Sequence, residues 1–220
     1  MPKSRAANLR GDVEMIYRVS AYLVWVMILL LTQVSCATTP PSNQSNVCSI
    51  FFEKDDWYAQ ALGAQKEWGT PVAVQMAIIH QESHFQSDVR PPRDWFLGVI
   101  PLPRSSSAYG YGQAQDGTWE WYMKATDNYG ADRDDFADVV DFIGWYTNVT
   151  QRKLGVSKWD AEKQYLAYHE GHGGYSRGTY LAKPWLQRVA KRVGAEAKRY
   201  AAQLKGCESK LDAGWSIWPF

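Results

Sequence analysis

The sequence has almost no net charge, because 24 lysines and arginines are balanced by 23 aspartates and glutamates, which leaves a formal charge of +1. A chain without a strong electrostatic field has no general means of holding nucleic acid or an anionic membrane. No long run of lysine and arginine concentrates positive charge in one segment. We therefore expect no nucleic-acid partner.

Long apolar runs, repeats and strand patterns are also scarce. Only residues 21–31 form an almost unbroken apolar run, and this run is short for a transmembrane helix, which needs about 20 apolar residues. The 220 residues contain no internal repeat and no convincing alternation of apolar and polar side chains. The length that remains after an N-terminal targeting segment suffices for one domain with its own core, and a second large domain is not expected.

Aromatic side chains, in contrast, are abundant, with 11 Trp and 13 Tyr. Such rings line carbohydrate-binding clefts, where they stack on the flat apolar faces of sugars, and they also fill hydrophobic cores. We expect most of them to belong to the core.

The first 36 residues have the order of an export signal. Arg18 precedes the apolar run 21–31, which ends close to Cys36, and a stretch rich in Thr, Pro, Ser and Asn follows over 37–46. This order resembles a bacterial lipoprotein signal and predicts a lipid on Cys36, an N-terminal membrane anchor and a flexible tether over 37–46. Gln33 stands three positions before Cys36, where such a signal usually has Leu. A plainly cleaved signal and an uncleaved anchor therefore stay open as alternatives.

The other two cysteines, Cys48 and Cys207, bracket the expected domain, residues 47–207. An exported protein meets an oxidising compartment, where such a pair can form a disulfide. We predict this bridge, with two buried free thiols as the alternative. Residues 208–220 are expected to be a C-terminal tail.

Helical spacing of apolar side chains recurs along the domain. It predicts a helix over 54–68 that stops at Gly69, and then a core helix that starts after Thr70 and Pro71 and is apolar nearly all round. Further helices are predicted over 117–127, 134–151, 160–169 and 183–205.

Residues 88–107 contain four prolines and cannot form a regular helix, so they predict a long loop. We expect this loop to lie beside the substrate cleft and to meet glycan or peptide stems. Trp95 and Arg104 are its expected contacts.

Glu82 is the most informative carboxylate, because it ends the apolar helix. Loss of water around it should disfavour its charged form and raise its pKa toward that of a useful proton donor. A buried, hydrogen-bonded structural glutamate is the alternative reading of this residue taken alone.

Three short motifs occur in a specific order. Glu82-Ser83 closes the apolar helix, Gly110-Tyr111-Gly112-Gln113 follows, and Ala167-Tyr168-His169-Glu170-Gly171 lies near the end of a later helix. This order resembles the soluble-lytic-transglycosylase family over roughly residues 48–205. The resemblance implies a lysozyme-like, mainly α (α+β) fold, a single helical domain with a deep substrate cleft.

The resemblance also implies roles for individual residues. Glu82 matches the catalytic acid and base, Ser83 its neighbour near the substrate, Gln113 the cleft glutamine, and Tyr168 the tyrosine whose hydroxyl helps to orient the catalytic carboxylate. Tyr111 stands where the family has Leu, and it is taken as a sugar contact.

Other positions depart from the family pattern. Gly112 replaces Met, while His169 and Glu170 replace Asn and Ala, which adds a second acid beside the cleft. We expect His169 and Glu170 to lie near the substrate. The gap between Glu82 and Gly110 is also longer than the family pattern, and the loop 88–107 accounts for the excess.

The implied activity is cleavage of the β-1,4 bond between N-acetylmuramic acid and N-acetylglucosamine in peptidoglycan, with formation of a 1,6-anhydro end. One carboxylate suffices when the substrate's own hydroxyl and N-acetyl group take part, so neither a cofactor nor a metal is expected. The setting would be the periplasmic side of a bacterial envelope.

Three rival readings remain. A lysozyme-type hydrolase would leave products with reducing ends, and a non-catalytic glycan-binding protein would release no products. A zinc peptidase is suggested by two histidine clusters, His80 with His84 and His169 with His172. Glu82, however, lies about 200° around the helix from His80 and about 160° from His84, on the far face.

Overall fold

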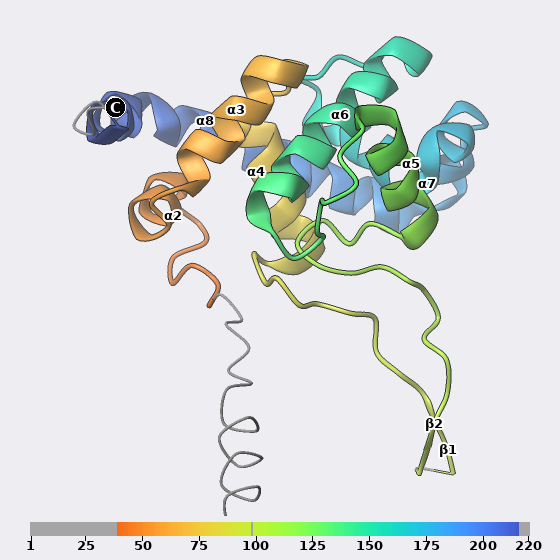
Figure 1. Cartoon of the computed structure of the whole chain (residues 1–220). Helices are drawn as coiled ribbons and strands as arrows, with labels where there is room; N and C mark the ends of the chain where they lie inside the picture. The colour runs from red at the N-terminus through yellow and green to blue at the C-terminus, as the bar shows by residue number, and fades with distance from the viewer. Residues whose placement is uncertain (1–38, 98, 216–220) are drawn as a thin grey trace, which may run out of the picture. The chain divides into compact units, whose positions relative to one another are not determined.

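The computed structural model describes residues 39–97 and 99–215, which belong to one compact unit (Figure 1). The predicted signal segment and Cys36 lie outside the described residues. Helices dominate, as predicted, and the elements in chain order are α2 (Val47–Glu53), α3 (Trp57–Trp68), α4 (Val72–Ser83), β1 (Trp95–Phe96), β2 (Ile100–Pro101), α5 (Asp116–Thr126), α6 (Phe136–Leu154), α7 (Ala161–Ser176), the 3-10 turn η1 (Thr179–Ala182) and α8 (Pro184–Trp215).

Helix α4 is the core helix that the sequence predicts. Every residue from Val72 to Ile79 is buried, because α3, α6, α7 and α8 all pack against this helix. The absence of a polar face on α4 therefore follows from its neighbours. Figure 1 shows α4 behind α3 and α6.

Close approach of α3 and α6 depends on Gly144. A Cβ atom at this position would lie 2.6 Å from Cδ1 of Trp68, which is closer than van der Waals contact allows. The Trp68 indole nitrogen also donates a hydrogen bond of 2.6 Å to Asp141 of α6. Glycine in a helix interior costs about 1 kcal/mol relative to alanine, and here it permits this packing.

The predicted disulfide between Cys48 and Cys207 is confirmed and joins α2 to α8, with 6.1 Å between the two Cα atoms. The neighbouring main chain is also tied to α8, because the Val47 amide donates to Oε1 of Gln203 at 3.0 Å. The two ends of the domain are thus fixed to each other.

Several element boundaries differ from the predictions. The helix expected over 54–68 is α3, which begins only at Trp57, and the short helix α2 before it, which ends at Glu53, was not predicted. Helix α8 continues to Trp215, so residues 208–215 extend the last helix and are not a separate tail. Leu211 packs into the core at this end.

Residues 39–46 do not form the free tether that the sequence predicts. The Ser42 amide and hydroxyl both donate to the Glu53 carboxylate, and the Tyr200 hydroxyl donates to the Gln44 carbonyl. Pro41 is buried. The ordered domain therefore begins before residue 47.

The long loop over 88–107 is present, but it contains a short antiparallel hairpin in which Trp95 pairs with Pro101. Figure 1 shows this hairpin extending away from the helices. None of the helices in the described part of the chain is long and apolar enough to cross a membrane.

Candidate active site

Glu82 lies in the last turn of α4, and the chain ends this helix with two strained residues. His84 and Phe85 both adopt left-handed backbone conformations, with φ of 52° and 60°, which cost free energy in residues other than glycine. Phe85 is fully buried and packs on Trp57 and on the His80 ring. Burial of this ring offsets the strain and fixes the end of the helix beside Glu82.

Glu82 faces a cavity of about 450 Å³ that four separate parts of the chain enclose. The parts are the end of α4, the segment leading into α5, the middle of α6, and the end of the first half of α7. The residues that line it are Glu82, Gln113, Ala114, Gln115, Thr118, Phe142, Tyr146, Tyr168, His169, Glu170 and Gly171.

The surroundings of Glu82 favour its protonated form. Burial raises the pKa of Glu82 to about 7, although a hydrogen bond with the Tyr165 hydroxyl acts in the opposite direction. Among the described residues no cation forms an ion pair with it. A carboxyl group with a pKa near 7 can both donate and accept a proton at neutral pH.

The segment that faces Glu82 across the cavity is held tightly. Gly110 has a φ of 77°, and a Cβ atom there would lie 1.9 Å from the Arg133 carbonyl oxygen, so only glycine fits. The side-chain amide of Gln113 donates to the carbonyls of Val89 and Gly110 at 2.9 and 2.8 Å. Gln113 therefore lines the cavity and also fixes the segment.

Tyr168 connects α7 to the same segment. Its hydroxyl donates a hydrogen bond of 2.5 Å to the Gly112 carbonyl, and a side chain at Gly112 would crowd that hydroxyl at 3.0 Å. Burial raises the pKa of Tyr168, and the nearby charge of Glu82 raises it further. Tyr168 thus forms part of the wall next to Glu82.

Comparison with known protein families matches residues 24–207 to the transglycosylase SLT domain. The chain belongs to the transglycosylase SLT domain family. A search of curated proteins found no match. Family membership points to an enzyme of the lytic-transglycosylase type that acts on the glycan strands of peptidoglycan.

Two sequence predictions on this SLT domain are wrong about orientation. Ser83 is buried and its hydroxyl donates to the Ile79 carbonyl of the preceding turn, so it does not line the cavity. Successive helical residues point about 100° apart, which turns Ser83 inward when Glu82 faces the cavity. Tyr111 is also buried, with its ring edge-on against Trp57 at 5.7 Å, and it belongs to the core.

The residue that hydrogen-bonds Glu82 is Tyr165, whereas the sequence predicts Tyr168 for this role. Tyr165 is buried on α7, and both burial and the charge of Glu82 raise its pKa. It lies three residues before Tyr168, which is one turn along the same face of a helix. The spacing places Tyr165 on the same face as Tyr168, but no motif marks it, and the spacing does not show that this face meets Glu82.

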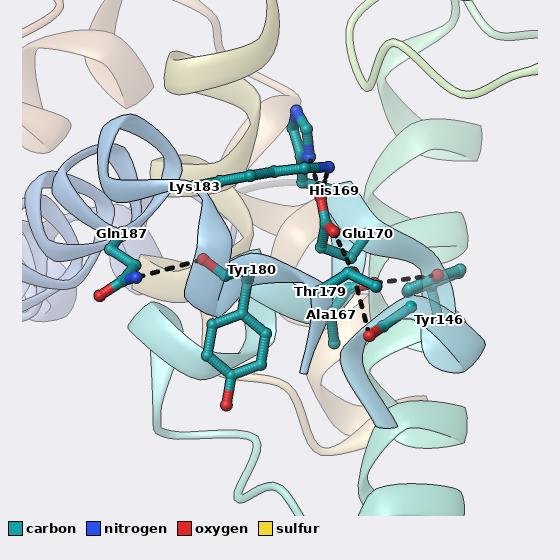
Figure 2. A network of polar contacts seen from close by, with 9 residues as sticks. Tyr146, Ala167, His169, Glu170, Thr179, Tyr180, Lys183 and Gln187 are labelled. Carbon is teal, nitrogen blue, oxygen red and sulfur yellow. Dashed lines mark hydrogen bonds and ion pairs between the residues drawn. The ribbon is translucent and has the colours of Figure 1, made fainter. Parts of the chain in front are cut away.

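Glu170 lies at the cavity, as the sequence predicts, and its carboxylate is held by three neighbouring side chains (Figure 2). Its side chain is 4 % exposed and accepts from Lys183 at 2.7 Å, from the Thr179 hydroxyl, and from His169, whose Nδ1 lies 3.1 Å away. Burial alone would raise the pKa of Glu170, but these hydrogen bonds outweigh burial and lower it to about 2.

This network fixes the rim of the SLT cavity. Gly171 breaks α7 with a φ of 70°, and the chain returns through η1, whose Thr179 binds Glu170. On the far side of η1, the Gln187 side chain donates to the Tyr180 carbonyl at 3.1 Å (Figure 2). From α6, the Tyr146 hydroxyl donates to the Ala167 carbonyl of α7 at 3.3 Å.

Three histidines of the SLT domain take structural positions, whereas His169 lines the cavity. Nδ1 of His80 lies 3.7 Å from Oε1 of Glu196 of α8, and α4 ends at His84. His172 stacks on Tyr146 with 4.4 Å between ring centres, and burial lowers its pKa to about 4. Among the described residues, no three His, Cys, Asp or Glu side chains cluster as metal ligands would.

Proposed function

We propose that this SLT domain is a lytic transglycosylase that cleaves the β-1,4 bond between N-acetylmuramic acid and N-acetylglucosamine, with Glu82 as both general acid and general base. The observation that carries the proposal is the position of Glu82 in the cavity with a pKa raised to about 7.

In the first step, protonated Glu82 donates its proton to the glycosidic oxygen as the bond to the anomeric carbon breaks. The substrate's N-acetyl group stabilises the positive charge that develops on the sugar. In the second step, ionised Glu82 takes the proton of the C6 hydroxyl of muramic acid while that oxygen attacks the anomeric carbon. The product carries a 1,6-anhydro ring, and Glu82 regains its proton without consuming water.

The state of Glu170, the second carboxyl group of the cavity, supports a mechanism in which Glu82 is the only catalytic carboxylate. Of the described residues that line the cavity, only Glu82 and Glu170 carry a carboxyl group. A hydrolase of the usual kind needs a second carboxylate free to attack the sugar or to activate water. Glu170 is occupied by Lys183, Thr179 and His169, so we assign it to holding the rim.

Replacement of each glutamate by glutamine tests the proposal. Glu82→Gln keeps the shape of the side chain but removes its proton, so turnover of purified sacculi should fall by roughly two to four powers of ten. Glu170→Gln is the matched control and should keep far more activity. Equal losses would indicate a two-carboxylate mechanism and contradict the proposal.

Mass spectrometry of the released muropeptides distinguishes the rival activities. The proposal expects 1,6-anhydro ends and no inhibition by EDTA. Reducing ends would identify a lysozyme-type hydrolase, and binding to sacculi without any release would identify a non-catalytic glycan-binding protein.

We also propose that the protein is a lipoprotein on the periplasmic side of the bacterial envelope, anchored through Cys36. The order of apolar run, cysteine and polar stretch supports this location, and so does a glycan substrate that lies in the same compartment.

A further inference from the structure

The hairpin of β1 and β2 exposes apolar side chains that the domain does not cover. Trp95, Leu97, Val99 and Leu102, here called the apolar tip, are 57 %, 80 %, 72 % and 41 % exposed. Exposed apolar clusters of this kind mark sites of interaction with other molecules. None of these four residues lines the cavity that Glu82 faces, so the contact with substrate expected for Trp95 is not supported.

Three arginines lie at the neck of the hairpin, between the apolar tip and the helices. They are Arg90, Arg93 and Arg104, and Asp94 is the only acidic residue between positions 90 and 104. The Arg90 guanidinium lies 3.8 Å from the centre of the Tyr109 ring, and Arg104 donates to the Pro91 carbonyl. The total charge of the chain is small, but this segment concentrates positive charge next to apolar side chains.

Pairing with a strand of another protein is a poor explanation for the hairpin. Each of its strands is two residues long, and Pro101 in β2 has no amide hydrogen to donate. Pro103 and Pro92 lie on either side of the strands, and prolines of this kind prevent edge-to-edge pairing. The side chains at the apolar tip are therefore the part available for binding.

The order of these features along the hairpin matches the depth profile of a lipid bilayer. Aliphatic residues and Trp95 are at the far end, where acyl chains and the interface would accept them. The arginines lie nearer to the domain, at the level where anionic head groups would attract them. We propose that the apolar tip inserts into the interfacial layer of a membrane that contains anionic lipid, with Arg90, Arg93 and Arg104 at the head groups.

Hydrogen bonds at the base of the loop 88–107 connect the hairpin to the segment that lines the cavity. The Gly110 amide donates to the Val89 carbonyl at 3.1 Å, and Gln113 donates to the same carbonyl. At the other end of the loop, Arg133 donates to the Ser107 carbonyl at 3.1 Å. Insertion of the tip would thus set the orientation of the cavity relative to the membrane, in addition to any N-terminal anchor.

A fluorescent label on the tip tests the proposal in the full chain. The protein would carry Cys36→Ser and Val99→Cys, and the new thiol would be labelled with a nitrobenzoxadiazole dye, since Cys48 and Cys207 are joined. In vesicles of phosphatidylcholine and phosphatidylglycerol, the dye emission should rise and move to shorter wavelength, and lipids with a nitroxide on the acyl chain should quench it. The same label at Trp159→Cys, a position 76 % exposed, is the control and should stay in water.

Arg93→Gln should reduce the membrane partition constant about fivefold in these vesicles and have little effect in pure phosphatidylcholine, because one cation near an anionic surface contributes about that factor. Equal quenching by aqueous iodide at positions 99 and 159 would overturn the proposal. A response of the Val99→Cys label to purified glycan strands but not to vesicles would also overturn it and would identify the hairpin as a carbohydrate contact.

Discussion

Replacement of Glu82 by glutamine should stabilise the fold in a manner that depends on pH. The pKa of Glu82 is raised from 4.5 to about 7, so ionising it in the folded protein costs roughly 3 kcal/mol more than in the unfolded chain. Below about pH 4.5 Glu82 is protonated in both the folded and the unfolded chain, so its ionisation takes no free energy from folding. As pH rises to about 7 the unfolded chain ionises first, and the folded state loses that amount of stability.

Denaturant unfolding of wild type and Glu82→Gln at several pH values measures this effect. The variant should gain up to roughly 3 kcal/mol of unfolding free energy above pH 7, and the gain should vanish near pH 4.5. The same substitution that abolishes activity would then make the protein more stable. A difference between the two proteins that does not change with pH would refute the argument that Glu82 is held in a desolvated site.

Glu170→Gln is the matched control, and its effect should have the opposite sign. The pKa of Glu170 is lowered to about 2, so its charge stabilises the fold above pH 4.5, and this contribution is lost as pH falls from 4.5 toward 2. Lys183 and His169 are 40 % and 35 % exposed, so screening by solvent reduces the effect to about 1 kcal/mol. The variant should be less stable than wild type at neutral pH.

Three further predictions concern other contacts. Tyr165→Phe removes the hydrogen bond that favours ionised Glu82, so the alkaline limb of the pH–activity profile should move upward by about one pH unit, and an unchanged profile would exclude Tyr165 as a positioning residue. Reduction of the Cys48–Cys207 bridge should lower the unfolding free energy by up to ~5 kcal/mol, since it closes a loop across nearly the whole domain, and a melting temperature insensitive to reductant would contradict this. Cys36→Ser should move the protein out of the membrane fraction and abolish palmitate labelling, whereas unchanged fractionation and labelling would rule out lipidation there.

Local chemistry determines which parts of the fold the sequence could predict. Helices α3 and α6 end at Gly69 and Gly155, both in the left-handed conformation, and the first of these two stops is predicted from its glycine in the sequence. The break between α2 and α3 and the continuation of α8 beyond residue 207 have no such local mark. They depend on contacts between distant segments, such as the burial of Leu211 against the core.

The same distinction applies to the site. Glu82 could be proposed from its place at the end of an apolar helix, because burial follows from that pattern. Ser83 was assigned to the substrate only by its place in a motif, and a motif does not say which way a side chain points on a helix. Tyr165 was missed because its contact with Glu82 brings α7 against α4, an arrangement that periodicity within α7 cannot reveal.

The bridge between Cys48 and Cys207 also determines how the domain would carry mechanical load. An enzyme anchored through its N-terminal segment and bound to a fixed glycan strand is pulled at both places. Tension that enters through residues 39–46 reaches Glu53, Tyr200 and then the bridge, and so passes directly into the long helix α8.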